Sequence, residues 1–277
     1  MSADLHLHSI YSDGSYTPRE LVQMAVNKGL DIIALTDHDT VKGITEAIEA
    51  GKESKVEVIP AIELSSYQGR TEIHILGYYL DYHSANLLKK LEQIFTFRLT
   101  RAEKMIVKLN QLGVNLNLDD VKKMAGDDFI GRPHIARAMV KAGYISCPGE
   151  AYTDQLIAYG GKAYVEKMQL TPAAAIDLII KARGIPVLAH PFIINNQGKP
   201  FGRKEIAELV QVGLQGIEVY HSKHDRQTST YYLNIARELG LLVTGGSDFH
   251  GLIKPNVAMG SVRIDNELVE RLKEARI

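Results

Sequence analysis

Residues 4–9 read DLHLHS, so apolar and polar side chains alternate along this stretch. Side chains two positions apart on a β-strand point to the same side, which places His6 and His8 on one face of a predicted strand and Leu5 and Leu7 on the other. In a β/α barrel the shared histidine face is the interior. The stretch therefore predicts two neighbouring imidazoles inside a barrel. They form a candidate metal site. The alternative interpretation is that both histidines have only a structural role.

The same strand pattern recurs along the chain. Short apolar runs alternate with longer amphipathic stretches, which is typical of repeated βα units. The predicted strands cover residues 3–8, 32–36, 56–64, 71–80, 185–190, 216–220 and 242–246. Helix starts are indicated at Thr17-Pro18 and Thr171-Pro172, where a capping threonine precedes a proline at the first helical position. Seven strands predict an α/β fold, namely a parallel barrel one strand short of the common eight.

Residues 84–168 break this rhythm, because their apolar spacing is helical throughout and no buried strand is evident. This segment holds 13 Lys and Arg against 9 Asp and Glu, a balance of +4, whereas the remainder holds 19 against 24, a balance of −5. We therefore predict a metal-binding barrel of residues 1–83 and 169–277 and a helical insert of residues 84–168 that caps the active site. An acidic barrel with a basic cap suggests a metal site that faces an anionic substrate.

Composition excludes several classes of protein. The chain has 277 residues, 45% of them hydrophobic and 23% charged, which is ordinary for a globular protein. A net charge of −1 gives no support for stable binding to duplex DNA or to an anionic membrane. The single cysteine, Cys147, excludes an intrachain disulfide and a multi-cysteine zinc site. Because no signal peptide or long apolar run is evident either, we expect a cytoplasmic protein.

Imidazole and carboxylate groups lie at or just after the ends of the predicted strands. Besides His6 and His8 they are Asp13, His38, Glu63, His74, His190, Asp248 and His250. Each alone has a structural explanation, but strand ends in a barrel converge on one rim. Nine nitrogen and oxygen ligands exceed the four that one zinc ion usually takes. The set suits manganese, iron, zinc or magnesium, and its size suggests two or three ions.

These residues resemble a known family. The matching stretches are HLH at residues 6–8, TDHD at 36–39, Glu63, His74, AHP at 189–191 and SDFH at 247–250. They are similar to the PHP (polymerase and histidinol phosphatase) family. The resemblance implies a distorted seven-stranded β/α barrel with a trinuclear metal site, and it makes manganese the leading ion.

The resemblance also implies how the ligands are shared among the ions. One ion would be held by His6, His8, Glu63 and Asp248. Glu63 would bridge to a second ion, held also by His74 and His190, and the third would be held by Asp13, His38 and His250. The resemblance further implies that Glu63, His190, Asp248 and His250 are catalytic. His190 or His250 could pass a proton, with a rim aspartate or a non-ligand histidine as an equal alternative.

Residues 129–137, with the sequence FIGRPHIAR, narrow the subfamily. They resemble a segment of free-standing bacterial PHP phosphoesterases, which act on nucleotides carrying 3′ and 5′ phosphates or trim short RNA from its 5′ end. Pro133 favours a helix start that places Arg132 and His134 beside free backbone N–H groups, an arrangement suited to phosphate. An ordinary helix cap is the alternative. Lys162 and His221, or else His224, are further candidate substrate contacts.

The sequence thus predicts a metal-dependent hydrolase that acts on phosphoric ester bonds. Its expected substrate is small and phosphorylated, namely a nucleoside 3′,5′-bisphosphate or a short oligoribonucleotide. One alternative is a phosphatase for another small phosphate ester such as histidinol phosphate, which the 129–137 segment disfavours. The other is a metal-stabilised binding module without turnover, which the complete ligand set disfavours.

Overall fold

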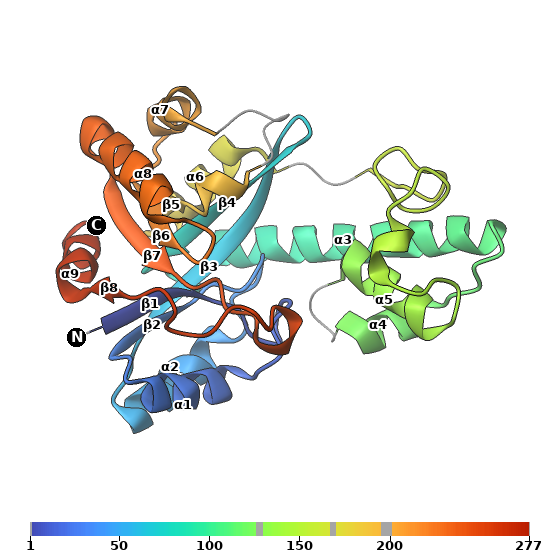
Figure 1. The fold of residues 1–277 in the computed structure, drawn as a ribbon, viewed down its shortest axis with the longest axis horizontal. Coiled ribbons are helices and arrows are strands. Elements are labelled where there is room, and N and C mark those ends of the chain that lie inside the picture. The colour runs from blue at the N-terminus through green and yellow to red at the C-terminus, as the bar shows by residue number, and fades with distance from the viewer. Residues whose placement is uncertain (1, 126–129, 167–169, 195–200, 277) are drawn as a thin grey trace. The chain divides into compact units, whose positions relative to one another are not determined.

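The computed structural model describes residues 2–125, 130–166, 170–194 and 201–276. The chain forms two compact units, a larger one of Met1–Lys89 and Gln169–Ile277 and a smaller one of Lys90–Met168. In the larger unit the strands curve into one sheet, with helices on its outer side (Figure 1). Capping of the active site by the insert stays a prediction.

One eight-stranded sheet forms the larger unit, in the order β7-β6-β5-β4-β3-β2-β1-β8. All seven predicted strands are present. The strands are β1 (Ser2–Leu7), β2 (Ile32–Leu35), β3 (Glu57–Gln68), β4 (Thr71–Tyr78), β5 (Ile185–Leu188), β6 (Gly216–His221), β7 (Leu242–Gly246) and β8 (Ile264–Asp265). The predicted α/β barrel is therefore confirmed. The eighth strand was not expected, because two residues are too short to carry an alternating pattern. It pairs antiparallel with β1, Ala3 facing Ile264.

The sheet is not wholly parallel, and the expectation of a parallel barrel is wrong at β4. This strand runs antiparallel to both β3 and β5. Gln68 of β3 pairs with Thr71 of β4, so only Gly69 and Arg70 connect the two strands. A two-residue connection can join only antiparallel neighbours, and Gly69 takes the positive φ of 60° that such a turn favours.

The sheet curls until its first strand meets the segment that follows β7. Leu7 of β1 forms a parallel bridge with Phe249. The His8 N–H donates to the Phe249 carbonyl oxygen at 3.0 Å, and the Asp248 N–H donates to the His6 carbonyl oxygen at 3.0 Å. These bonds nearly close the barrel, and they bring two widely separated stretches of predicted ligands side by side.

Helices cover the outer side of the sheet. They are α1 (Pro18–Lys28), α2 (Ile44–Ser54), α6 (Pro172–Lys181), α7 (Arg203–Gln211), α8 (Arg226–Leu239) and α9 (Asn266–Glu274). The Thr17 hydroxyl accepts from the Glu20 N–H and the Thr171 hydroxyl from the Ala174 N–H, each at 3.2 Å. Both predicted helix starts are therefore confirmed. Leu21 of α1 packs against Leu7 in a buried apolar cluster between the helices and the sheet.

The smaller unit has its own apolar core. Its helices are α3 (Ala85–Gln111), which starts in the larger unit, α4 (Leu118–Ala125), α5 (Arg132–Lys141) and a short 3₁₀ helix (Pro148–Ala151). Met105, Leu109 and Met139 are fully buried in this core. Residues 152–166 form turns instead of a helix, so the expectation of helix throughout is wrong there. Gly160 takes a positive φ of 74°, and glycine is a poor helix former.

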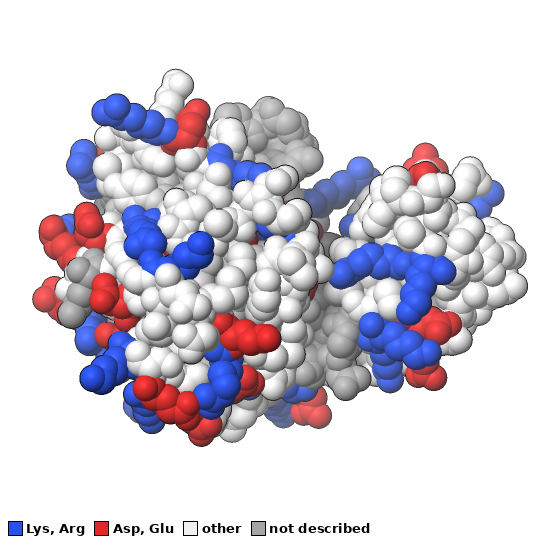
Figure 2. Space-filling model, turned by 60° about the horizontal axis from the view of Figure 1, so that its bottom comes forward, with Lys and Arg blue, Asp and Glu red and all other residues white. Residues whose placement is uncertain are grey.

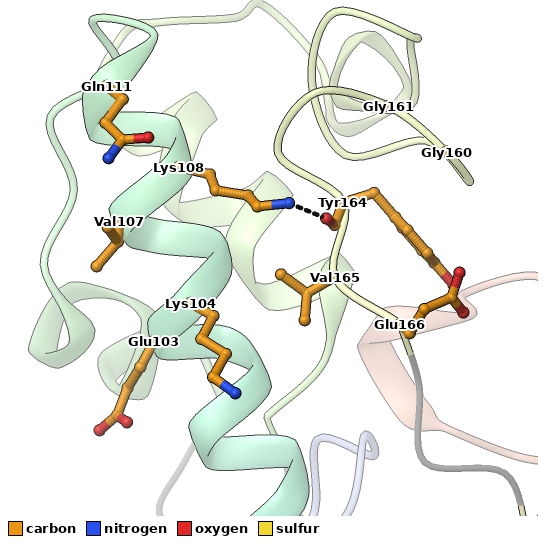
Figure 3. A pocket seen from close by; sticks show the side chains of 10 residues that line it. All are labelled: Glu103, Lys104, Val107, Lys108, Gln111, Gly160, Gly161, Tyr164, Val165 and Glu166. Carbon is orange, nitrogen blue, oxygen red and sulfur yellow. Dashed lines mark hydrogen bonds between the residues drawn. The ribbon is translucent and has the colours of Figure 1, made fainter.

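A cavity of about 800 Å³ lies beside α3 in the smaller unit (Figure 3). Lys104 and Lys108 line it together with Glu103 and Glu166, so its charged groups are of both signs. The Lys108 ammonium donates to the Tyr164 carbonyl oxygen at 2.7 Å. None of the predicted substrate-binding residues lines this cavity.

The surface carries charges of both signs. Lys and Arg side chains are interspersed with Asp and Glu on the visible face of the larger unit (Figure 2), as the near-zero net charge leads one to expect. No helix in the described parts of the chain is both long and apolar enough to cross a membrane.

Closure of the barrel should not tolerate a side chain at Gly246 of β7. A Cβ there would lie 2.4 Å from the backbone nitrogen and the Cβ of His6. We expect Gly246→Ala to lower the free energy of unfolding by about 1–3 kcal/mol through overpacking, as measured by denaturant unfolding. Gly149→Ala is the control, because its Cβ would meet nothing closer than the Cys147 Sγ at 3.9 Å. Equal stability of the two variants would contradict this close approach.

Candidate metal centre

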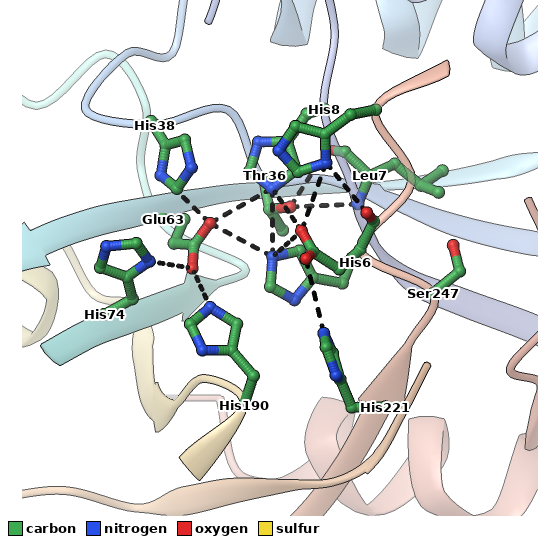
Figure 4. Close-up of polar contacts among 12 residues, drawn as sticks. His6, Leu7, His8, Thr36, His38, Glu63, His74, His190, His221 and Ser247 are labelled. Carbon is green, nitrogen blue, oxygen red and sulfur yellow. Dashed lines mark hydrogen bonds and ion pairs between the residues drawn. The ribbon is translucent and has the colours of Figure 1, made fainter. Parts of the chain in front are cut away.

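The Glu63 carboxylate lies fully buried among five histidine rings (Figure 4). Oε2 of Glu63 is 3.2 Å from a ring nitrogen of each of three histidines, and Oε1 is 2.8–2.9 Å from a ring nitrogen of two others. The first three nitrogens are His6 Nε2, His8 Nε2 and His38 Nδ1, and the other two are His74 Nδ1 and His190 Nε2. One carboxylate thus brings together ligand candidates from four separate stretches of the chain.

Two further carboxylates flank this arrangement. Asp13 Oδ1 lies 3.2 Å from His250 Nε2 and 3.8 Å from His8 Nδ1. Asp248 Oδ1 lies 3.4 Å from His8 Nε2 and 3.6 Å from His6 Nε2. All nine predicted ligands therefore converge on one region of the larger unit.

The converging atoms form four overlapping groups, within each of which the ligand atoms lie less than 4.8 Å apart. The groups are His8, Asp13, His38 and His250; His6, His8 and Asp248; His6, Glu63 and His190; and His38, Glu63 and His74. Imidazoles mixed with carboxylates, without sulfur, are the donors expected for divalent transition ions. The residues present therefore fit such ions. The division of ligands among individual ions stays a prediction.

Two of the ligand candidates stand on strained backbone. His190 has a φ of 28° and Asp248 a φ of 58°, a region that costs residues other than glycine free energy. Both residues come just after a buried strand, β5 and β7 respectively. This backbone conformation changes the direction of each side chain just after its strand ends. Such a conformation persists only where surrounding contacts stabilise it.

The buried charges shift one another's protonation. Burial raises the pKa of the Glu63 carboxyl, but His38 and His6 outweigh burial and hold this pKa well below its usual value. Burial lowers the pKa of the His8 imidazole, yet hydrogen bonds to Asp248 and Glu63 raise it to about 9. A histidine must lose its proton before it can bind a metal, so metal binding at this site should release protons.

Two buried aspartates that sequence reasoning missed hold the segments that carry the ligands. Asp4 accepts hydrogen bonds from the N–H and the hydroxyl of Ser247, at 2.8 and 2.6 Å. Asp37 accepts from the Ser9 N–H at 2.7 Å and from the Ser12 hydroxyl at 2.6 Å. Acidic residues beside otherwise apolar strand segments were the available signal for both.

Glu218 and Lys254 were also missed. Glu218 lies within β6, fully buried, and accepts from the His6 Nδ1–H at 2.9 Å. The Lys254 ammonium lies 2.8 Å from Asp248 Oδ2 and is partly exposed. A carboxylate in the apolar run of 216–221 could have marked Glu218, but the sequence holds no signal for Lys254.

Like its alternative His224, the predicted substrate contact His221 belongs to the larger unit. Its ring is buried, and Nε2 lies 3.5 Å from Asp248 Oδ2. Nδ1 accepts a hydrogen bond from the Lys223 N–H at 3.1 Å. Because Nδ1 accepts, the network assigns the proton of a neutral ring to Nε2, on the side of Asp248.

The other three candidates belong to the smaller unit. The Arg132 guanidinium donates to the Ile157 carbonyl oxygen at 3.2 Å and lies 5.5 Å from the centre of the Tyr152 ring. His134 is buried, and its Nδ1 accepts from the Gly131 N–H at 3.1 Å at the start of α5. Lys162 is exposed. The predicted helix start is confirmed, and substrate contact by these residues stays a prediction.

Comparison with known proteins places this geometry in context. Residues 4–179 match the family described as PHP domain. A 5′-3′ exoribonuclease of Haemophilus influenzae is 35% identical over 248 residues, which are 89% of this chain and 89% of the relative. A 3′,5′-nucleoside bisphosphate phosphatase of Chromobacterium violaceum is 31% identical over 248 residues, 89% of this chain and 86% of the relative.

A solved structure matches the fold over nearly the whole chain. A protein from Bifidobacterium adolescentis, described as a metal-dependent phosphoesterase, superposes with a TM-score of 0.87 at 30% identity. The match covers 99% of this chain and 96% of the other. The similarity therefore extends through both units and is not confined to the ligand motifs.

Glu63 should be the most sensitive ligand position. Glu63→Gln keeps the side chain's shape but removes the charge that five imidazoles face, so we expect metal content and phosphoesterase turnover both to collapse. Elemental analysis and phosphate release measure the two effects. His83→Ala is the control, because His83 is exposed and is no proposed ligand. Near-normal metal content in the glutamine variant would remove Glu63 from the centre.

Proposed function

The chain belongs to the PHP domain family and is a metal-dependent phosphoesterase, and on that premise we propose that it removes phosphate from nucleoside 3′,5′-bisphosphates or short oligoribonucleotides. The observation that carries the proposal is the set of nitrogen and oxygen donors around the buried Glu63 carboxylate. The relatives that act on such substrates match this chain over most of its length.

We propose two or three bound divalent ions, with manganese the leading choice and iron, zinc or magnesium the alternatives. Six imidazoles and three carboxylates would hold them, namely His6, His8, His38, His74, His190, His250, Asp13, Glu63 and Asp248. When bound, such ions favour deprotonation of water near neutral pH and offset the charge of phosphoryl oxygens. The proposed reaction is hydrolysis of a phosphoric ester bond.

The chain's own side chains then orient the reacting groups. Glu63, His190, Asp248 and His250 are the proposed catalytic residues, the first from the middle of β3 and the others from the segments that follow β5 and β7. His221 carries its proton at Nε2, on the side of Asp248, so it can donate a hydrogen bond to an oxygen atom bound there. This is the role we propose for His221 in substrate binding. Lys254, which contacts the same carboxylate, adds a positive charge beside it.

A second phosphate needs a second positive contact, for which we propose Arg132, with His134 and Lys162 as additional contacts. The Ile157 carbonyl and the Tyr152 ring hold the Arg132 guanidinium in place, which lowers the entropy lost on binding a phosphate. The segment that contains these residues carries an excess of four positive charges. Such a charge favours a substrate with more than one phosphate. We further propose that the enzyme acts in the cytoplasm.

A hydrolysis screen with Mn²⁺, which measures released phosphate and, for RNA, released nucleotides, tests the substrate class. It compares nucleoside 3′,5′-bisphosphates, short RNAs, mononucleotides and histidinol phosphate. The proposal expects the first two to be preferred. Preference for histidinol phosphate would favour the small-ester alternative, and no release from any ester would favour a non-catalytic module.

Metal content is a separate expectation. Because nine ligands converge, protein purified after metal-supplemented expression should carry two or three transition ions per chain by elemental analysis. Dialysis against a strong chelator should remove them together with the activity. Fewer than one ion per chain in the supplemented protein would contradict a multinuclear site.

Arg132→Ala separates the substrate pocket from the metal site. A lost charge-assisted contact is worth roughly 1.5–3 kcal/mol, or about 10- to 150-fold at 1.4 kcal/mol per decade. We expect kcat/KM for a bisphosphate to fall by about that factor, mainly through KM, with metal content unchanged. For p-nitrophenyl phosphate, which lacks a second phosphate, kcat/KM should fall much less.

Arg137→Ala serves as the control, since it removes a guanidinium from the same helix α5 without touching a proposed contact. If Arg132→Ala impairs both substrates equally, Arg132 serves the reacting phosphoryl group instead. If it impairs neither, Arg132 only stabilises the start of the helix.

A further inference from the structure

Glu218 is a fully buried carboxylate that is not among the predicted metal ligands. It lies in the middle of β6, a central strand between β5 and β7. A buried carboxylate costs much free energy unless both of its oxygens have partners. Both oxygens of Glu218 do have partners, and each partner belongs to a proposed metal ligand.

The first oxygen, Oε1, faces the ring of His6. The distance from Oε1 to His6 Nδ1 is 2.9 Å, and a carboxylate at this distance requires the proton on Nδ1. His6 Nε2 is then left with a lone pair, and this atom lies 3.2 Å from Glu63 and 3.6 Å from Asp248. A carboxylate behind a histidine in this way selects the tautomer and makes the ligating nitrogen more basic.

The second oxygen, Oε2, holds the backbone of His190. It accepts the His190 N–H at 2.8 Å, at the residue whose φ of 28° is strained. The His190 ring lies beyond this bond, with Nε2 2.9 Å from Glu63 Oε1. The hydrogen bond offsets the strain and so keeps the ring aimed at the centre.

We propose that Glu218 is a positioning residue of the metal centre, which uses one carboxylate to hold the His6 ring and the His190 backbone together. The proposal rests on the proposed metal-dependent function and deepens it. His6 and His190 belong, with Glu63, to one group of converging ligand atoms, so Glu218 fixes two members of the same group. Asp4 and Asp37 are buried as well, but they accept from backbone N–H groups and serine hydroxyls.

Glu218→Gln tests this arrangement, because glutamine has one acceptor and one donor where two donors face it. If the amide oxygen accepts from His6, the amide NH₂ opposes the His190 N–H. If the amide oxygen accepts from His190, the NH₂ meets His6 Nδ1 and moves the His6 proton to the ligating Nε2. Either orientation damages one ligand.

The measurement is the dissociation constant for Mn²⁺ in folded, chelator-stripped protein, determined by competition with a metal-binding dye. We expect the glutamine variant to bind about 10- to 100-fold more weakly than the original chain. Thr244→Val is the matched control, since Thr244 is the buried cross-strand partner of Glu218 on β7 and is no proposed ligand. Unfolding of the metal-free proteins is followed in parallel, so that a loss of stability is not mistaken for a loss of affinity.

Unchanged Mn²⁺ affinity in Glu218→Gln would overturn the proposal, and so would an equal loss in Thr244→Val. If the glutamine variant does not fold, Glu218→Asp gives the same test, because it keeps the charge but is one methylene too short to reach both partners. It too should bind Mn²⁺ more weakly. If the original chain itself did not bind Mn²⁺, the proposed metal-dependent function would be contradicted. Failure of that function is therefore distinguishable from failure of the proposal for Glu218.

Discussion

The Glu63 carboxylate, buried among five imidazoles, is the interaction on which the rest of the larger unit depends. An isolated charge at this depth would be prohibitively costly, so the fold must bring compensating groups from several strands to within 3.2 Å of it. One such group is His74 of β4, the strand paired antiparallel with β3, which carries Glu63 itself. Closure of the barrel brings Asp248 to within 3.6 Å of His6 and 3.4 Å of His8, whose rings in turn face Glu63.

The ligand candidates keep their positions because other buried residues form hydrogen bonds to them or to the neighbouring backbone. Three buried carboxylates provide this support, and none of them is a predicted ligand: Asp4, Asp37 and Glu218. Asp4 and Asp37 hold segments next to predicted ligands, and Glu218 holds the ring of His6. The strained backbone at His190 and Asp248 persists because such contacts over-determine it. The centre is therefore built in two layers. In the outer layer Glu218 selects the nitrogen that His6 presents, and Asp4 and Asp37 hold backbone segments beside the ligands.

The two units contribute differently to the proposed chemistry. The larger unit contains all the proposed metal ligands and His221, so it can hold the reacting phosphoryl group. The smaller unit has its own core and carries the positive charge that suits a further phosphate. In the proposed function the metal ligands serve the reaction, whereas Arg132 of the smaller unit serves to bind the second phosphate.

The sequence by itself determined the strand pattern and the two Thr-Pro helix starts, because alternation and capping are local patterns. It also indicated all nine candidate ligands, because residues such as His6 and His8 lie two positions apart within short motifs. It did not predict the direction of β4, because the predicted third strand ended at residue 64, whereas β3 runs to Gln68 and leaves only a two-residue turn before β4. The two-residue strand β8 was missed because its partner, β1, lies far away along the chain. A carboxylate in an apolar run marked Glu218 as unusual, but its partners could not be predicted, because they too lie far away along the chain. Its role depends on Nδ1 of His6 and the N–H of His190, 212 and 28 residues away, and only the tertiary structure brings these two donors to one carboxylate.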